Sequence, residues 1–133
     1  MKKKQELNED VAREMNKYLD DESIEEILIR NKKRFHYYVM FNQNQMKSDI
    51  EVLDLGARAY NCLKRAGCST VGDLVRRFGT KEDATSKGQL KNLRNLGATT
   101  ADEILVKLFY YQFLVLPDDK KREYMHDIKV SNN

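Results

Sequence analysis

The stretch IEVLDLGARAYNCLKRAGCSTVGDL, residues 50–74, carries the signals that decide the fold. Residues 58–66 suit a helix, and Gly67 follows them in the position where a left-handed residue commonly ends one. Thr70 can then cap a second helix over 71–78, which Gly79 ends. The stretch therefore predicts two short helices joined by a tight turn.

The residues that follow predict a helix-hairpin-helix element. A capping-box pattern favours a third short helix over 87–93. Asn95-Leu96-Gly97 is typical of a tight hairpin, and Thr100 with Glu103 can cap a fourth helix behind it. Two short helices joined by a Leu-Gly hairpin make up that element.

The segment before residue 50 predicts a helical extension. Apolar side chains recur at helical spacing over 7–19, and Asn8 is placed to cap that helix. Ser23 with Glu26 forms a capping box for a second helix. We extend this second helix through the aromatic residues 35–41, although these residues also suit a strand.

Pro117 begins a last amphipathic helix, whose apolar face carries Tyr124, Met125 and Ile128. We therefore predict an all-α fold, a compact bundle of short helices with flanking helical segments. Its expected parts are a helical N-terminal extension over 1–49, a helix-hairpin-helix domain over 50–116, and a C-terminal helix and tail over 117–133.

The charge of the protein is nearly balanced, with 24 Lys and Arg against 21 Asp and Glu in 133 residues. The surplus of three falls within 50–116, which hints at an anionic partner for that segment, although simple solvation accounts for most charged surfaces. The longest apolar run, 108–116, is interrupted by Gln112 and is too short to span a membrane. We expect a cytoplasmic protein whose two cysteines are reduced.

The sequence offers little for catalysis. His36 and His126 lie in different segments without a cysteine pair at metal-ligand spacing, so we expect no metal site. Phosphate-binding loops, nucleophile elbows and paired-carboxylate motifs are also missing from the sequence. We expect a protein that is not an enzyme and needs no cofactor.

A helix-hairpin-helix element has a physical use. The second helix presents unpaired backbone N–H groups and the positive end of its dipole at the hairpin. A phosphate fits there, and the missing side chain of Gly97 allows a nucleic-acid backbone to approach closely. Such a contact holds DNA without reading its sequence. A plain helix turn explains the same dipeptide equally well.

The run at 50–74, together with LRNLG at 93–97 and the capped helix after it, resembles the C-terminal domain of the bacterial RNA polymerase α subunit. The similarity covers roughly residues 50–113. Because 49 residues cannot encode the assembly domain of an α subunit, we expect a free-standing relative of the C-terminal domain.

The resemblance implies a DNA-binding surface. It places Arg58 in the minor groove of A/T-rich DNA, where a narrow groove concentrates negative potential. The further contacts that it implies are Asn61, Cys62, Lys64, Asn95, Gly97 and Thr100. Local packing is the alternative for Asn61 and Cys62, and an ion pair with Asp54 is the alternative for Arg58.

The sequence departs from the family pattern in three places. Ala98 and Thr99 stand where the family usually has two basic residues after the hairpin glycine. The segment between Leu74 and Ser86 is longer than in the family. Its cations Arg76, Arg77 and Lys81 either restore positive charge to the surface or only keep a loop solvated. The acidic surface that the family uses toward σ factor is reduced to Glu51 and Asp54, because Val52 replaces an acid.

Two functions therefore compete. The first is a DNA-binding module for bacterial transcription regulation that contacts the A/T-rich minor groove and phosphates of double-stranded DNA. The second is a protein-interaction module that docks on RNA polymerase, σ factor or an activator without significant DNA binding. Retention of Arg58 and Asn61 favours the first function, and the loss of the basic pair after the hairpin favours the second.

Overall fold

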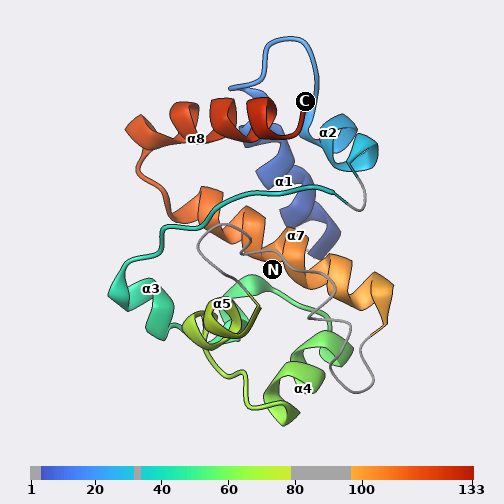
Figure 1. Cartoon of the computed structure of the whole chain (residues 1–133), viewed down its shortest axis with the longest axis vertical. Helices are drawn as coiled ribbons and strands as arrows, with labels where there is room; N and C mark the ends of the chain where they lie inside the picture. The colour runs from blue at the N-terminus through green and yellow to red at the C-terminus, as the bar shows by residue number, and fades with distance from the viewer. Residues whose placement is uncertain (1–3, 32–33, 79–96) are drawn as a thin grey trace. The chain divides into compact units, whose positions relative to one another are not determined.

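The computed structural model describes residues 4–31, 34–78 and 97–133. These residues form helices without a β-strand, apart from an isolated bridge between Asp49 and Thr70, which confirms the predicted all-α class. The helices are α1 (Lys4–Asn16), α2 (Ile24–Arg30), α3 (Gln43–Lys47), the 3-10 helix η1 (Ile50–Leu53), α4 (Ala57–Arg65), α5 (Val71–Phe78), α7 (Ala98–Val115) and α8 (Asp118–Ser131) (Figure 1). The predicted helix over 87–93 and the residues Asn95 and Leu96 of the hairpin lie outside the described residues.

The molecule divides into two compact units. One unit joins Met1–Tyr37 with Phe113–Asn133, and the other is Tyr38–Gln112, so that the division falls within α7. These limits differ from the expected parts 1–49, 50–116 and 117–133. In particular, the structure groups the C-terminal helix with the N-terminal segment.

The first unit contains α1, α2 and α8. The predicted capping box of α2 is confirmed, because the Glu26 amide donates to Ser23 Oγ and the Ser23 amide donates to the Glu26 carboxylate. The predicted last helix is also confirmed, with its predicted apolar face buried. The prediction that Asn8 caps the first helix is wrong, because α1 already begins at Lys4.

The C-terminal end of α8 is tied to the segment behind α2 by a buried asparagine. Asn132, which is 2% exposed, accepts a hydrogen bond from the His36 amide at 2.9 Å through Oδ1. Its Nδ2 donates to the carbonyls of His36 at 2.8 Å and Ile128 at 2.9 Å. The Asn132 carbonyl in turn accepts from the side chains of Arg30 and Asn31.

Residues 35–42 belong to no helix, so the prediction of a helix through this segment is wrong, and the alternative strand does not form either. The backbone of this segment forms a hydrogen bond outside any regular element, because the Met40 amide donates to the buried side chain of Gln112. The aromatic rings also pack outside any helix, with the Phe41 ring centroid 5.4 Å from that of Tyr111. Specific tertiary contacts thus override the local propensity of the segment.

The second unit is built around α4, α5 and the first part of α7. The predicted helices over 58–66 and 71–78 are confirmed to within one residue. Gly67 has the left-handed φ of +84° that ends α4, and Thr70 Oγ1 accepts from the Asp73 amide at 3.0 Å as the predicted cap of α5. The core of this unit includes Ile50, Leu53, Ala59, Leu63, Val71, Leu74, Ile104, Leu108 and Phe109.

No helix among the described residues is both long enough and apolar enough to cross a membrane. The same residues contain no group of three or more His, Cys, Asp or Glu side chains arranged to hold a metal ion.

Candidate nucleic-acid interface

The start of α4 is anchored by α7. Gly56 is the N-cap of α4, where its carbonyl accepts from the Tyr60 amide at 2.9 Å. The Gly56 amide donates to the carboxylate of Glu103 on α7 at 2.7 Å. Because Glu103 lies in the second turn of α7, this hydrogen bond brings the first turn of α4 close to the N-terminal part of α7 (Figure 1).

The turn before α4 is held by a second contact to α7. Asp54 adopts a left-handed φ of 56°, and its Oδ2 lies 3.6 Å from Nζ of Lys107. The Lys107 side chain is 7% exposed, so this pair is shielded from solvent on the lysine side. Sequence reasoning considered Arg58 as the partner of Asp54, whereas Lys107 is the ion-pair partner that the structure gives it.

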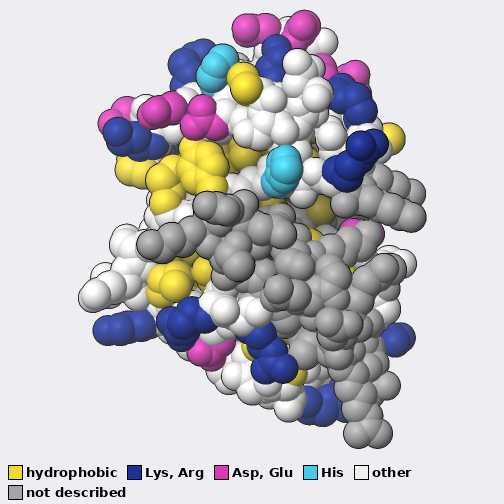
Figure 2. Space-filling model, in the orientation of Figure 1, with side chains coloured by type: hydrophobic (Ala, Val, Ile, Leu, Met, Phe, Trp, Pro, Cys, Tyr) yellow, Lys and Arg dark blue, Asp and Glu magenta, His cyan; other side chains and the backbone are white. Residues whose placement is uncertain are grey.

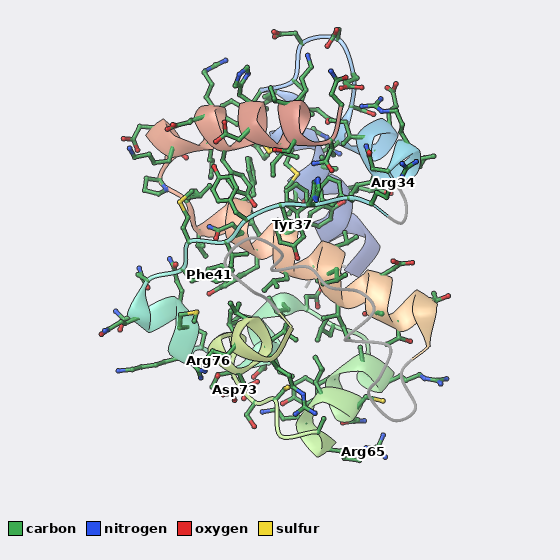
Figure 3. The ribbon with its side chains drawn as sticks, viewed as in Figure 1. Arg34, Tyr37, Phe41, Arg65, Asp73 and Arg76 are labelled. Carbon is green, nitrogen blue, oxygen red and sulfur yellow. The ribbon has the colours of Figure 1, made fainter. Side chains whose placement is uncertain are left out.

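An exposed polar stripe runs along α4. Asn61 and Arg65 follow Arg58 by three and seven residues, which places all three on one helix face. All three side chains are exposed. Figure 3 shows Arg65 at the C-terminal end of this helix. The buried residues Ala59 and Leu63 lie on the opposite side, so the stripe faces away from the core. This "α4 stripe" is an accessible cationic surface.

Two of the predicted contact residues are not part of this stripe. Cys62 is 5% exposed, so its thiol packs in the core rather than on the surface that the resemblance implies. Lys64 is only partly exposed, and its Nζ lies 2.6 Å from Oδ2 of Asp49 and 5.2 Å from the Tyr60 ring centroid. The hydrogen bond to Asp49 raises the pKa of Lys64 and lowers that of Asp49, so the two charges satisfy each other.

The N-terminus of α7 begins earlier than predicted. The Ala101 amide donates to the Gly97 carbonyl at 3.0 Å, and the helix starts at Ala98. Thr100 therefore lies within the first turn, and the prediction that it caps this helix with Glu103 is wrong; Glu103 binds Gly56 instead. Gly97 is exposed, and a Cβ placed on it would meet nothing within 4 Å. Asn95 lies outside the described residues.

The other cations considered in this part of the molecule are engaged locally. Arg76 Nη2 lies 3.1 Å from Oδ1 of Asp73, and Arg77 Nη1 donates to the Ala66 carbonyl at 2.8 Å. Lys81 lies outside the described residues. On the expected acidic surface Glu51 and Val52 are exposed, while Asp54 contacts Lys107.

Sequence reasoning missed two residues and one contact of this site. Arg65 follows Arg58 by seven residues, so helical spacing alone could have placed it on the stripe. Lys107 occupies a core position in the pattern of Ile104 and Leu108, which signals a buried cation that requires a partner. The contact of Glu103 with Gly56 joins residues far apart in the sequence and had no local signal.

The family model for the C-terminal domain of the alpha subunit of bacterial RNA polymerase matches residues 40–109, which is more than half of the sequence. The protein belongs to this family. The resemblance inferred from the sequence is thereby confirmed. The match to the alpha C-terminal domain family begins before α3 and nearly coincides with the unit Tyr38–Gln112.

Several relatives are DNA-directed RNA polymerase alpha subunits. The subunit of Mycoplasmoides gallisepticum is 34% identical over 113 residues, which cover 85% of this protein and 27% of the relative. That of Arthrobacter sp. FB24 is 48% identical over 63 residues, covering 47% of this protein and 16% of the relative. The protein thus spans 27% or less of these two curated relatives. No solved structure matches it.

Proposed function

We propose that the alpha C-terminal domain of this protein binds double-stranded DNA in bacterial transcription regulation, through the α4 stripe and the first turn of α7. The observation that carries the proposal is the hydrogen bond between Gly56 and Glu103, which brings the first turn of α4, where Arg58 is exposed, close to the N-terminal part of α7. Both belong to the unit that the family model matches. The proposal assigns the protein no catalytic step.

Arg58 is the residue that we assign to the minor groove. A long guanidinium on the first turn of an exposed helix can reach into a groove that is too narrow for the helix itself. A-tract DNA has such a narrow groove, with enhanced negative potential. Preference for A/T-rich DNA therefore depends on this side chain.

The first turn of α7 supplies the phosphate contact in this proposal. Its leading backbone N–H groups have no acceptor within the helix, and the helix dipole favours an anion there. Gly97 is exposed and presents no side chain, while Thr100 adds a hydroxyl in the same turn. Contacts of this kind position the duplex without reading bases.

The test is an Arg58→Ala variant titrated against an A-tract duplex and a G/C-rich duplex at matched salt. We expect affinity for the A-tract duplex to fall by about tenfold to a hundredfold, with the preference between the two duplexes lost. Arg76→Ala removes the same charge from α5 and should leave the preference intact. Preference that survives in Arg58→Ala would show that another residue senses the groove.

Two neighbouring cations of α4 are expected to contribute differently to DNA binding. Arg65 lies on the stripe, whereas Lys64 is bound to Asp49. We expect Arg65→Ala to weaken binding to both duplexes alike and to reduce the log–log salt slope by about 0.9, the loss of one phosphate contact. Lys64→Ala should change the slope less. An equal or larger change in Lys64→Ala would contradict this assignment of the phosphate contact.

A second candidate is a protein-interaction module without useful DNA affinity. It is favoured by the engagement of Lys64 with Asp49 and by the neutral residues Ala98 and Thr99 at the start of α7. A wild-type protein with no measurable affinity for either duplex at low salt would select this candidate. Under both candidates we place the protein in the cytoplasm, and under the first we place it at the nucleoid.

A further inference from the structure

A pocket of about 580 Å³ opens between α3 and α5, and none of its lining residues belongs to the proposed DNA interface. Figure 3 shows Phe41 on the segment before α3, and Asp73 and Arg76 on α5. The lining residues are Phe41, Gln43, Met46, Lys47, Thr70, Asp73 and Arg76. All of them lie in the unit Tyr38–Gln112.

The walls of the pocket are fixed to each other by the backbone. The Val71 amide donates to the Ser48 carbonyl at 2.9 Å, and the Ile50 amide donates to the Ser69 carbonyl at 3.0 Å. α3 also approaches α5 closely at Gly72, where a Cβ would lie 2.8 Å from the Met46 carbonyl oxygen. The pocket is therefore part of the folded unit.

The floor of the pocket is apolar and adaptable. Phe41 is half-buried and packs on Tyr111, which leaves part of its ring toward the pocket. Met46 is also half-buried, and a flexible thioether group adjusts to different apolar groups. Figure 2 shows hydrophobic side chains exposed over α3, with Lys and Arg side chains beside them.

The charge around this floor is positive. Asp73 accepts hydrogen bonds from the amides of Ser69 and Thr70, which lower its pKa, and its other oxygen binds Arg76. Lys47 is exposed and has no ion pair with the described residues. The Arg76 side chain is 66% exposed. A ligand on this pocket thus meets an apolar floor with cations at its rim.

We propose that this pocket docks a short acidic segment of a partner protein, in which an apolar group covers Phe41 and Met46 while a carboxylate pairs with Lys47. An apolar floor with a few charged groups at its rim is typical of sites that bind an apolar group with an adjacent charge. A phosphate backbone offers the floor no apolar group, so the observations favour a protein segment over DNA. The proposal goes beyond the DNA-binding function and does not depend on it.

The test uses the 133-residue protein, labelled with nitrogen-15, and three synthetic peptides. The probe alternates Asp with Phe and Leu; one control replaces each Asp by Asn, and the other replaces Phe and Leu by Ser. We expect the probe to shift amide resonances of Met46, Lys47 and Thr70, and both controls to bind at least about tenfold more weakly. A probe that shifts none of these resonances would overturn the proposal.

Charge reversal provides the matched variants. Lys47→Glu should weaken probe binding by about tenfold, because an attraction becomes a repulsion at an exposed site. Lys120→Glu makes the same change of charge at an exposed position outside the pocket and should leave the affinity unchanged. Equal affinities of the two variants would overturn the proposal. So would pocket resonances that respond to a DNA duplex but not to the probe.

Discussion

Asn132→Ala is expected to lower the free energy of unfolding of the first unit by about 3 kcal/mol. The side-chain amide makes three hydrogen bonds, two to the backbone of His36 and one to the Ile128 carbonyl. Each is worth about 1 kcal/mol net, and buried partners left without a hydrogen bond add to the loss. The residue is 2% exposed, so water does not readily replace the lost amide.

Asn133→Ala is the matched control, because it makes the same substitution one residue further along at an exposed position. Urea unfolding followed by far-UV circular dichroism gives the midpoint and slope for both variants. Hydrogen exchange of the α2 and α8 amides then assigns any loss to the first unit rather than the second. Equal midpoints for the two variants would show that the side-chain amide of Asn132 adds nothing to stability.

The helices that the sequence predicted well are those whose end signals are local. Ser23 with Glu26, Thr70 and Gly67 each act on backbone groups a few residues away, and each does so in the structure. Such signals can be recognised in a single sequence because the donor, the acceptor and the turn lie within one short stretch.

Two of the predictions that failed involve contacts between residues far apart in the sequence. The aromatic segment 35–41 lacks a helix because the Met40 amide binds Gln112 and the Phe41 ring packs on Tyr111. Thr100 does not cap α7 because this helix already begins at Ala98, and Glu103, the predicted partner of Thr100, binds Gly56 instead. No periodicity within one segment encodes such pairs.

The predicted contact residues of the candidate interface likewise include some that the structure places as expected and some that it does not. The exposure of Arg58 and Asn61 agrees with the surface placement that the family resemblance implies. Cys62 and Lys64 differ because one packs in the core and the other binds Asp49. Once the buried side of α4 is known, helix geometry shows which side chains lie on its exposed face. Arg65 lies on that face and therefore replaces Lys64 as a candidate for DNA contact.

Gly72→Ala is expected to destabilise the second unit by about 2 kcal/mol, although alanine is the better helix former. Gly72 is buried, and an added Cβ would lie 2.8 Å from the Met46 carbonyl oxygen, a backbone atom that cannot move without displacing α3. Overpacking of this kind typically costs about 1–3 kcal/mol. The same displacement would strain the backbone hydrogen bond between Val71 and Ser48.

Gly97→Ala is the matched control for this substitution, because a Cβ at Gly97 meets nothing within 4 Å. We expect its unfolding midpoint to stay near that of the wild type, while Gly72→Ala unfolds at clearly lower urea and loses exchange protection in α5. A stable Gly72→Ala variant would mean that α3 can move away from α5 at little cost. Since the pocket lies between these helices, the variant should also weaken binding of the acidic probe peptide, whereas Gly97→Ala should leave that binding unchanged.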